Sequence, residues 1–490
     1  MILTLDLGTS TTKAVVWDGD GPRAEGRASV VTTFPAGDRA EQDPAGWWPS
    51  VVGACAQARQ AAPAAFAAVA AVGFAAARQT FVGVTAAGEP LGPALVWSDR
   101  RAVAEAGVLA EAVGGVDAWR ARTGAVLDGG AVAAKAAWLA RHERHRWASA
   151  RWLLTPRDFV VSLMTGAVVT DVTMVSASGL VDPFGEPVVE LMAGVGDRLP
   201  PVVGPDTVVG TVATAAAAEL GLHGGEPVVI GAGDRACEVL GTAATAGQPM
   251  VSWGTTANVS LPVGDFPGPV PRGLAASRAV DGWLLEGGLS GAGSLLGWLS
   301  ALTGSGAEAL MAKAAAAPVG AGGALVLPWF GGARAPWWRD GARGGFVGLS
   351  FDHDAGHLAR AVVEAVAWEV LRCLRAAGAV PPDGPVPATS LWLTGAHAHA
   401  APWPDVVAAV TGLPARRRRS GQAGSAGAAL LTARATGADY DLERLDPVVA
   451  TVTPNPSDVA RYAYLRTEAE AAAAAVIGLA FPGAPTEATP

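Results

Sequence analysis

The chain has 490 residues, of which 50% are hydrophobic and 16% are charged, so it is long enough for at least two globular domains and is not intrinsically disordered. Its formal net charge of −9 argues against a nucleic-acid partner, which would require a basic surface. The three cysteines, Cys55, Cys237 and Cys373, lie far apart and indicate neither a disulfide framework nor a metal site, so we expect a cytoplasmic protein.

The chain opens with a predicted hairpin that carries a phosphate-type turn. Ile2–Asp6 and Lys13–Trp17 are its expected strands, with Gly8 at the bend. Glycine leaves backbone N–H groups free and the hydroxyls of Thr9 and Ser10 add donors, so the turn predicts an anion site. Because Asp6 interrupts the apolar run, we expect no signal peptide.

Further elements are predicted along the first half of the chain. The uncharged stretch 61–77 is mostly alanine and contains Pro63 and Gly73, so it predicts a helix end and the buried strand Val69–Phe74 rather than a membrane span. The others are a helix over 43–62 with Asp43 and Pro44 as cap and first turn, the apolar run 95–97 before the polar cluster 98–101, and a helix over 131–146.

A second turn of the same kind lies in the middle of the chain. Residues 250–260 repeat the strand–turn–strand pattern, with Gly254, Thr255 and Thr256 in the turn. Just before it, the short strand Pro227–Ile230 is expected to deliver Asp234 on a glycine-rich loop, where α/β proteins bind ligands. Two such turns with an acid between them predict a duplicated domain that clamps a polyphosphate, although the chain has no Walker motif.

The second half completes an α/β pattern. The predicted elements are helices over 295–302, 357–375 and 423–435, a strand over 391–394 and a loose tail over 482–490.

In this order, the motifs resemble the FGGY carbohydrate kinases of the actin-like, ribonuclease-H-like ATPase superfamily, from about residue 1 to about residue 440. Glu41–Pro44 with Trp47 and Trp48 is similar to an early loop of xylulokinases, and Pro93–Asp99 to the sugar-pocket strand. Lys135, Trp138 and His142 fall on the first FGGY signature, from which Val132 and Ala136 depart, and residues 344–364 fit the second.

The resemblance implies two ribonuclease-H-like domains with a cleft between them. Residues 1–241 would bind sugar and carry the base, 242–440 would bind nucleotide, and 441–490 would form a helical segment and a loose tail. The implied reaction is ATP-dependent phosphorylation of a sugar or polyol hydroxyl with Mg²⁺. Asp234 would be the catalytic base and Asp6 would hold hydrated Mg²⁺. The implied nucleotide contacts are Thr9, Ser10, Lys13, Gly254, Thr255, Thr256, Gly293, Gly395, Ala396 and His397.

The implied sugar contacts are Arg78, Gln79, Trp97, Asp234 and Arg235. Arg78 and Gln79 stand where typical xylulokinases have Met-His and glycerol kinases have Arg-Glu. The tyrosine expected near Gly130 in glycerol kinases is absent, which argues against glycerol. We therefore expect a xylulokinase-like enzyme for a ketopentose such as xylulose; another ketose, a polyol or a sugar acid such as gluconate stays open. Nucleic-acid and membrane partners are not expected, and a homodimer is left open.

Two segments depart from the family pattern. Gly395–Ala398 replaces Gly-Gly-Gly-Ala in the adenine loop, so the His397 side chain would crowd the base or stack on it. Gly332–Arg334 lacks the acid of the usual Gly-Glu-Arg. The altered adenine loop keeps open a catalytically silent sugar or nucleotide sensor. An NAD-dependent oxidoreductase is disfavoured because the glycines near Gly293 lack the dinucleotide spacing, and a chaperone ATPase because no peptide-binding domain is seen.

Several conspicuous residues are expected to be structural. Trp138 is predicted to be in the core, Lys135 to be solvated or capping, and Arg416–Arg419 to form a solvated loop. His397 and His399 have no third ligand at metal spacing, so no metal site is predicted there.

Overall fold

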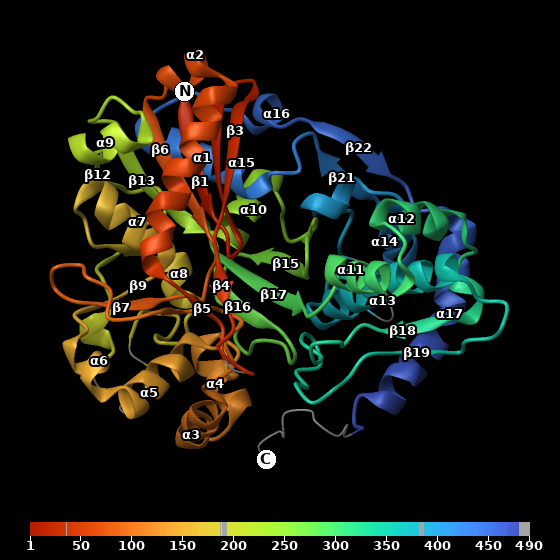
Figure 1. Ribbon diagram of the computed structural model, residues 1–490. Helices are drawn as coiled ribbons and strands as arrows, with labels where there is room; N and C mark the ends of the chain where they lie inside the picture. Colours follow the sequence, from red (N-terminus) through yellow and green to blue (C-terminus); the bar gives the residue numbers. More distant parts are fainter. Residues whose placement is uncertain (36, 187, 189–193, 382–386, 480–490) are drawn as a thin grey trace.

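The computed structural model describes residues 1–35, 37–186, 188, 194–381 and 387–479. The described chain forms two lobes, each built on a mixed β-sheet flanked by helices (Figure 1). In Figure 1 the N-terminal lobe, red to yellow-green, lies on the left, and the C-terminal lobe, teal and blue, lies on the right.

The sheet of the N-terminal lobe has six strands in the order β12-β13-β6-β1-β2-β3. β1 pairs antiparallel with β2 and parallel with β6, and β6 pairs parallel with β13. The strands are β1 (Ile2–Leu7), β2 (Thr11–Asp18), β3 (Gly21–Ser29), β6 (Ala71–Ala76), β12 (Val208–Thr211) and β13 (Pro227–Gly233).

The sheet of the C-terminal lobe repeats this arrangement. Its order is β16-β17-β15-β14-β20-β21-β22, with β14 antiparallel to β15 and parallel to β20. The strands are β14 (Met250–Trp253), β15 (Ala257–Val263), β16 (Ala275–Arg278), β17 (Trp283–Leu289), β20 (Leu391–Thr394), β21 (Ala415–Arg418) and β22 (Val448–Val452). The repeated order confirms the predicted duplication and the two-domain α/β fold.

The two turn motifs occupy equivalent places in the two sheets. Gly8 closes the β1–β2 hairpin by donating its N–H to the Thr11 carbonyl at 3.1 Å, and Gly254 donates to Thr256 at 2.9 Å. Both hairpins were predicted from the sequence and are confirmed. Each turn therefore lies at the end of a central strand.

Two helices, α10 (Asp234–Thr242) and the small-residue helix α15 (Ala423–Thr436), pack against each other between the sheets. α15 comes from the C-terminal part of the chain but also packs on β1 and β6, as its blue ribbon behind α1 shows (Figure 1). A Cβ at Gly241 or Gly427 would collide with the backbone of the facing helix. Glycine at these two positions therefore permits the close approach.

The remaining helices pack either on the sheets or on one another. The predicted helix over 43–62 is confirmed as α1 (Trp47–Ala61), preceded by a short turn in which the Asp43 side chain accepts from the Ala45 N–H at 3.0 Å. The stretch 61–77 forms α2 (Pro63–Ala67) and β6, and none of the helices within the described ranges is long and apolar enough to span a membrane. The predicted helix over 131–146 is divided into α5 (Val132–His142) and α6 (Arg144–Ser149).

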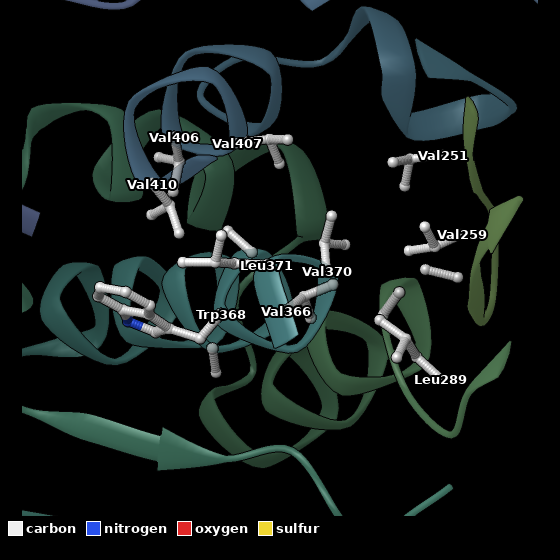
Figure 2. Packing of buried hydrophobic residues seen from close by; sticks show 14 of the residues in the cluster. Val251, Val259, Leu289, Val366, Trp368, Val370, Leu371, Val406, Val407 and Val410 are labelled. Atoms are coloured by element: carbon white, nitrogen blue, oxygen red, sulfur yellow. The ribbon is translucent and has the colours of Figure 1, made fainter. Parts of the chain in front are cut away.

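The core of the C-terminal lobe is centred on α13 (Ala355–Ala376), which confirms the helix predicted over 357–375. Figure 2 shows Val366, Val370 and Leu371 of α13 between two partners. On one side lie the valines of α14 (Trp403–Thr411), and on the other Val251, Val259 and Leu289 of the sheet. Burial of these side chains anchors α13 to the sheet of the C-terminal lobe.

The structure corrects the predicted environment of Arg416–Arg419. Residues 415–418 are not a solvated loop but strand β21, which pairs with β20 and β22. Arg418 is only 4% exposed and donates to the carbonyls of Thr242 and Asp446. Strand pairing and the burial of Arg418 depend on segments far away in the chain, which charge counting along the sequence does not anticipate.

The C-terminal segment predicted over 441–490 contains more than a helix. Its described part forms α16 (Leu442–Leu445), β22 at the edge of the second sheet and α17 (Pro456–Val476). The loose tail predicted over 482–490 lies outside the described residues.

Candidate active site

A cavity of about 470 Å³ lies between the lobes, a size typical of small-molecule sites. Both lobes line it: the β1–β2 turn and the end of β6 from one, the β14–β15 turn and β17 from the other. All five predicted sugar residues line it, namely Arg78, Gln79, Trp97, Asp234 and Arg235. Four of the predicted nucleotide residues line it as well, namely Thr9, Ser10, Thr255 and Thr256.

Asp234 is the first residue of α10, not part of a loop as predicted. The strand that precedes it runs to Gly233, because Ala232 and Gly233 pair with β6 and the Gly233 N–H donates to Thr173 at 2.8 Å. A Cβ at Gly231, whose φ is +70°, would collide with the Phe74 carbonyl. The sharp strand-to-helix junction places the Asp234 carboxylate at a helix N-terminus, where negative charge is stabilised.

The two oxygens of Asp234 have different surroundings. Oδ1 accepts from the Arg235 backbone N–H at 2.8 Å and from Arg78 Nε at 3.2 Å. Oδ2 accepts no hydrogen bond from the described residues, and Arg235 Nε lies 3.9 Å from it. One oxygen is thus anchored and the other is available to a ligand.

Arg78 is held by an acid that the sequence analysis did not identify. Its two terminal nitrogens donate to Glu286 on β17 at 2.8 and 2.6 Å, and one of them also donates to Ser277 at 3.1 Å. Burial would raise the pKa of Glu286, but the Arg78 guanidinium outweighs it and holds this pKa below its usual range. Because Glu286 lies on the other lobe, the ion pair joins the two lobes across the cavity.

Arg235 is paired with a different carboxylate, that of Glu238. It forms an ion pair with Glu238 one helical turn away at 2.6 Å, and Glu238 also accepts from Ser252 of β14 at 2.8 Å. Burial raises the pKa of Glu238 despite Arg235. The charge of Arg235 is therefore already paired, although the residue lines the cavity.

Lys135 is buried, not solvated or capping as predicted. Its ammonium donates to the carbonyls of Gln79 and Val96 at 2.8 Å each and of Leu95 at 3.4 Å. Gln79 has a left-handed backbone (φ +64°), which is unusual for a residue with a side chain. Lys135 thus joins the two segments that carry Gln79 and Trp97, and Trp97 in turn donates from Nε1 to Thr9 Oγ1 at 2.9 Å.

We expect Lys135 to make stability depend on pH. Burial lowers the pKa of Lys135 to about 7, so between about pH 7 and 10 the unfolded chain binds more protons at this residue than the folded chain does. The free energy of unfolding should rise with pH in that window, by up to about 1.4 kcal/mol per pH unit from this group. Urea unfolding of the wild type and Lys135→Met at pH 7, 8 and 9 measures it. The free energy of unfolding of the wild type minus that of Lys135→Met should increase from pH 7 to pH 9. If this quantity did not change with pH, the assignment of the lowered pKa to Lys135 would be contradicted.

Asp6, the predicted metal ligand, faces Lys13 across the β1–β2 hairpin, with Nζ 3.4 Å from Oδ2. Burial raises the pKa of Asp6 and the nearby Asp234 carboxylate adds to this, while Lys13 opposes it. Across the described ranges, no three His, Cys, Asp or Glu side chains are grouped to enclose a metal. The arrangement fits a Mg²⁺ ion that keeps most of its ligands as water and phosphate oxygens.

The other predicted nucleotide residues form a surface beside the second turn. The Gly293 N–H donates to Gly254 at 3.1 Å, which fixes the start of α11 (Gly293–Thr303) against the turn. His397 lies against Gly293, where a Cβ would collide with its Nε2, and its ring is 5.9 Å from that of Trp403. Gly395 has φ +88° and no room for a Cβ beside Trp253, while Ala396 is exposed. His397 therefore fills space between two glycine segments.

Several cavity residues were not identified as site residues from the sequence. Arg100 forms an ion pair with Asp128, and Arg334 lies over the rings of Trp97 and Trp338 at 5.7 and 5.5 Å. Arg100 and Arg334 lie in segments singled out above, but no local pattern marks Glu286, Ser277, Asp128 or Trp338. Trp138, predicted in the core, lies partly buried at its edge beneath Arg101.

Comparison with known proteins gives the chain relatives along nearly its whole length. Residues 1–241 match the N-terminal domain and residues 250–436 the C-terminal domain of the FGGY family of carbohydrate kinases. The xylulose kinase of Streptomyces rubiginosus is 29% identical over 438 residues, 88% of this chain and 86% of that protein. The glycerol kinase of Aromatoleum aromaticum is 31% identical over 470 residues, 91% of this chain and 92% of that protein. The crystal structure of xylulose kinase from Rhodospirillum rubrum superposes with a TM-score of 0.83 at 27% identity, covering 96% of this chain and 98% of that one.

Proposed function

The chain belongs to the FGGY family of carbohydrate kinases, and we propose that it transfers the γ-phosphoryl group of ATP to a sugar hydroxyl bound beside Asp234. It is a phosphotransferase with an alcohol group as acceptor. The observation that carries the assignment of the base is the unequal pair of oxygens on Asp234, one anchored by two donors and the other free at the cavity.

In the proposed reaction, Asp234 Oδ2 accepts the proton of the acceptor hydroxyl. The hydroxyl oxygen forms a bond to the γ-phosphorus, the bond from that phosphorus to the β,γ-bridging oxygen breaks, and ADP leaves. Arg78 orients the carboxylate through Oδ1, and Glu286 holds Arg78 in place. Since most N–H groups of Arg78 already have partners, its main contribution is positioning.

The two turns supply the phosphate contacts in this proposal. Thr9 and Ser10 face the cavity from one lobe and Thr255 and Thr256 from the other, so hydroxyl and backbone donors approach the transferred group from two sides. Lys13 adds a positive charge beside Asp6. Mg²⁺ bound near Asp6 would supply charge neutralisation on the phosphates.

The class of sugar that accepts the phosphoryl group is a more specific question than the kinase activity. The names of the relatives include xylulose kinase, glycerol kinase and gluconokinase, so ketopentoses, polyols and sugar acids are all represented. The resemblance to the xylulokinase branch favours a ketopentose. Trp97, Gln79 and Arg235 offer an apolar face and donors to any of the three.

ADP release in the presence of Mg-ATP, measured across ketoses, polyols and sugar acids, tests the proposal. We expect turnover that depends on one group of compounds and on Asp234. ATP binding by calorimetry without turnover on any compound would instead support a sensor, and the absence of ATP binding would contradict the nucleotide assignment.

A further inference from the structure

One arginine of the cavity, Arg334, differs from the others in its surroundings. It lies in the segment between β18 (Leu325–Leu327) and β19 (Gly345–Val347), where its carbonyl accepts from the backbone N–H groups of Trp337 and Trp338 at 2.8 and 3.0 Å. This turn fixes the backbone, and the guanidinium lies over the rings of Trp97 and Trp338 at the cavity wall.

The other three cavity arginines each have a carboxylate partner. Arg78 pairs with Glu286, Arg100 with Asp128, and Arg235 with Glu238. In the part of the chain that the structure describes, the Arg334 side chain forms no ion pair and donates no hydrogen bond, and its Nε is buried without a partner. Arg334 therefore carries a positive charge that no neighbouring side chain neutralises by direct contact.

Leaving such a group unpaired is unfavourable unless a ligand completes it. The Nε of Arg334 has lost its solvation without gaining a partner, while the rest of the side chain is only partly buried and faces the cavity. Burial and the nearby Arg100 guanidinium lower the pKa of Arg334, but an arginine stays protonated at neutral pH. The cavity thus presents a permanent, preformed cation with free donors.

We propose that the acceptor is a sugar acid whose carboxylate binds Arg334 while its hydroxyl chain extends to Asp234. This inference rests on the proposed kinase activity and replaces the ketopentose, which the resemblance alone favours, with a sugar acid as the acceptor. The planar guanidinium can donate two parallel hydrogen bonds to a carboxylate, a geometry that a ketose carbonyl cannot match. One unpaired cation also suits a charge of −1 better than that of a phosphate monoester, which is close to −2.

The alternative role for Arg334 is contact with the transferred phosphoryl group. The charged groups that act most strongly on Arg334 are Arg100, Asp128, Asp340 and Arg235. None of these belongs to either predicted phosphate turn, and Arg100 and Asp128 belong to the N-terminal lobe, on which the predicted sugar residues lie. The position of Arg334 therefore favours the acceptor over the nucleotide.

The test compares five- and six-carbon aldonates with their uncharged amides, the alditols of equal length, and xylulose. For the wild type we expect kcat/KM to be roughly 10- to 100-fold higher for an aldonate than for its amide, the range expected of a charge-assisted hydrogen bond. Arg334→Gln should remove most of this preference and leave the KM for ATP within about twofold. Arg334→Lys, which keeps the charge, should retain part of the preference and shows that the site still folds.

Arg343→Gln is the matched control. Arg343 belongs to the same segment, donates to the carbonyls of Asp340 and Ala342, and is not among the described residues that line the cavity. The preference of the Arg343→Gln variant for aldonate over amide should equal that of the wild type.

The outcomes separate this inference from the kinase assignment. Efficient turnover of a neutral sugar with no preference for the aldonate would overturn the sugar-acid proposal and leave the kinase intact. A rise in the KM for ATP in Arg334→Gln, with the acceptor KM unchanged, would move Arg334 to the phosphate. If no compound supports ADP release, the kinase assignment fails; calorimetry with aldonate and amide then still decides the carboxylate site, because equal or absent binding of both would refute it.

Discussion

Asp234→Asn is expected to lower kcat by about two to four orders of magnitude, the range that a positioned general base contributes. Asparagine preserves the shape of the side chain and its Oδ1, so the contacts from Arg78 and the Arg235 backbone can persist. The amide nitrogen that replaces Oδ2 cannot accept the proton of the acceptor hydroxyl. Steady-state ADP release measures the loss of turnover, and ATP binding by calorimetry checks that the site is otherwise preserved.

Asp281→Asn is the control for this experiment. Asp281 also carries a carboxylate, but its side chain is 77% exposed and its nearest cation, Arg434, is 3.6 Å away. We expect its kcat to match the wild type. If Asp234→Asn kept wild-type turnover with its preferred acceptor, another group would have to accept the proton and the base assignment would be wrong.

Arg157→Met is expected to lower the free energy of unfolding by about 3–5 kcal/mol, because it leaves buried carboxylates without their cation. Arg157 is fully buried and donates to Asp158 and Asp171, both at 2.7 Å and both buried. Asp171 in turn accepts from the Thr173 backbone and hydroxyl, and Thr173 binds the Gly233 N–H beside Asp234. The loss should therefore reach the active site as well as the fold. Urea unfolding followed by circular dichroism measures it.

A triple variant tests the physical reason. Adding Asp158→Asn and Asp171→Asn to Arg157→Met removes the unpaired charges while keeping the shapes of the side chains, so part of the lost stability should return. If the triple variant were no more stable than Arg157→Met, packing and not charge would explain the loss. A single-variant effect below about 1 kcal/mol would show that the network is solvated in solution.

Much of the fold could be predicted because its signals are local. Strand β20 follows from four residues and both hairpins from glycine turns between apolar strands, and the structure confirms them. The loop predicted before Asp234 was wrong because the glycines at 231 and 233 look like a loop in isolation. Their conformation depends on β6 and Thr173, which lie far away in the sequence.

In the active site, the contrast between residues predicted from local patterns and residues placed by distant segments is stronger. The sequence identified Asp234, Arg78 and the two turns, but not Glu286, which pairs with Arg78 from a strand 208 residues later. It also predicted a solvated Lys135, since a cation on an alanine-rich helix usually points to water. Three carbonyls from residues 39 to 56 positions away accept its hydrogen bonds instead.

The sequence by itself determined both hairpins with their glycine turns, the duplicated architecture, the family and the residue types at the reacting centre. These follow from patterns within ten or so residues, where backbone preference and hydrophobic periodicity act. Only the tertiary structure decided that Arg78 and Arg100 are neutralised by acids distant in the sequence, and that Arg334 has no ion-pair partner among the described residues. Ion pairing falls off with distance in space, and distance in space between residues on different lobes is set by how the sheets meet, not by spacing along the chain.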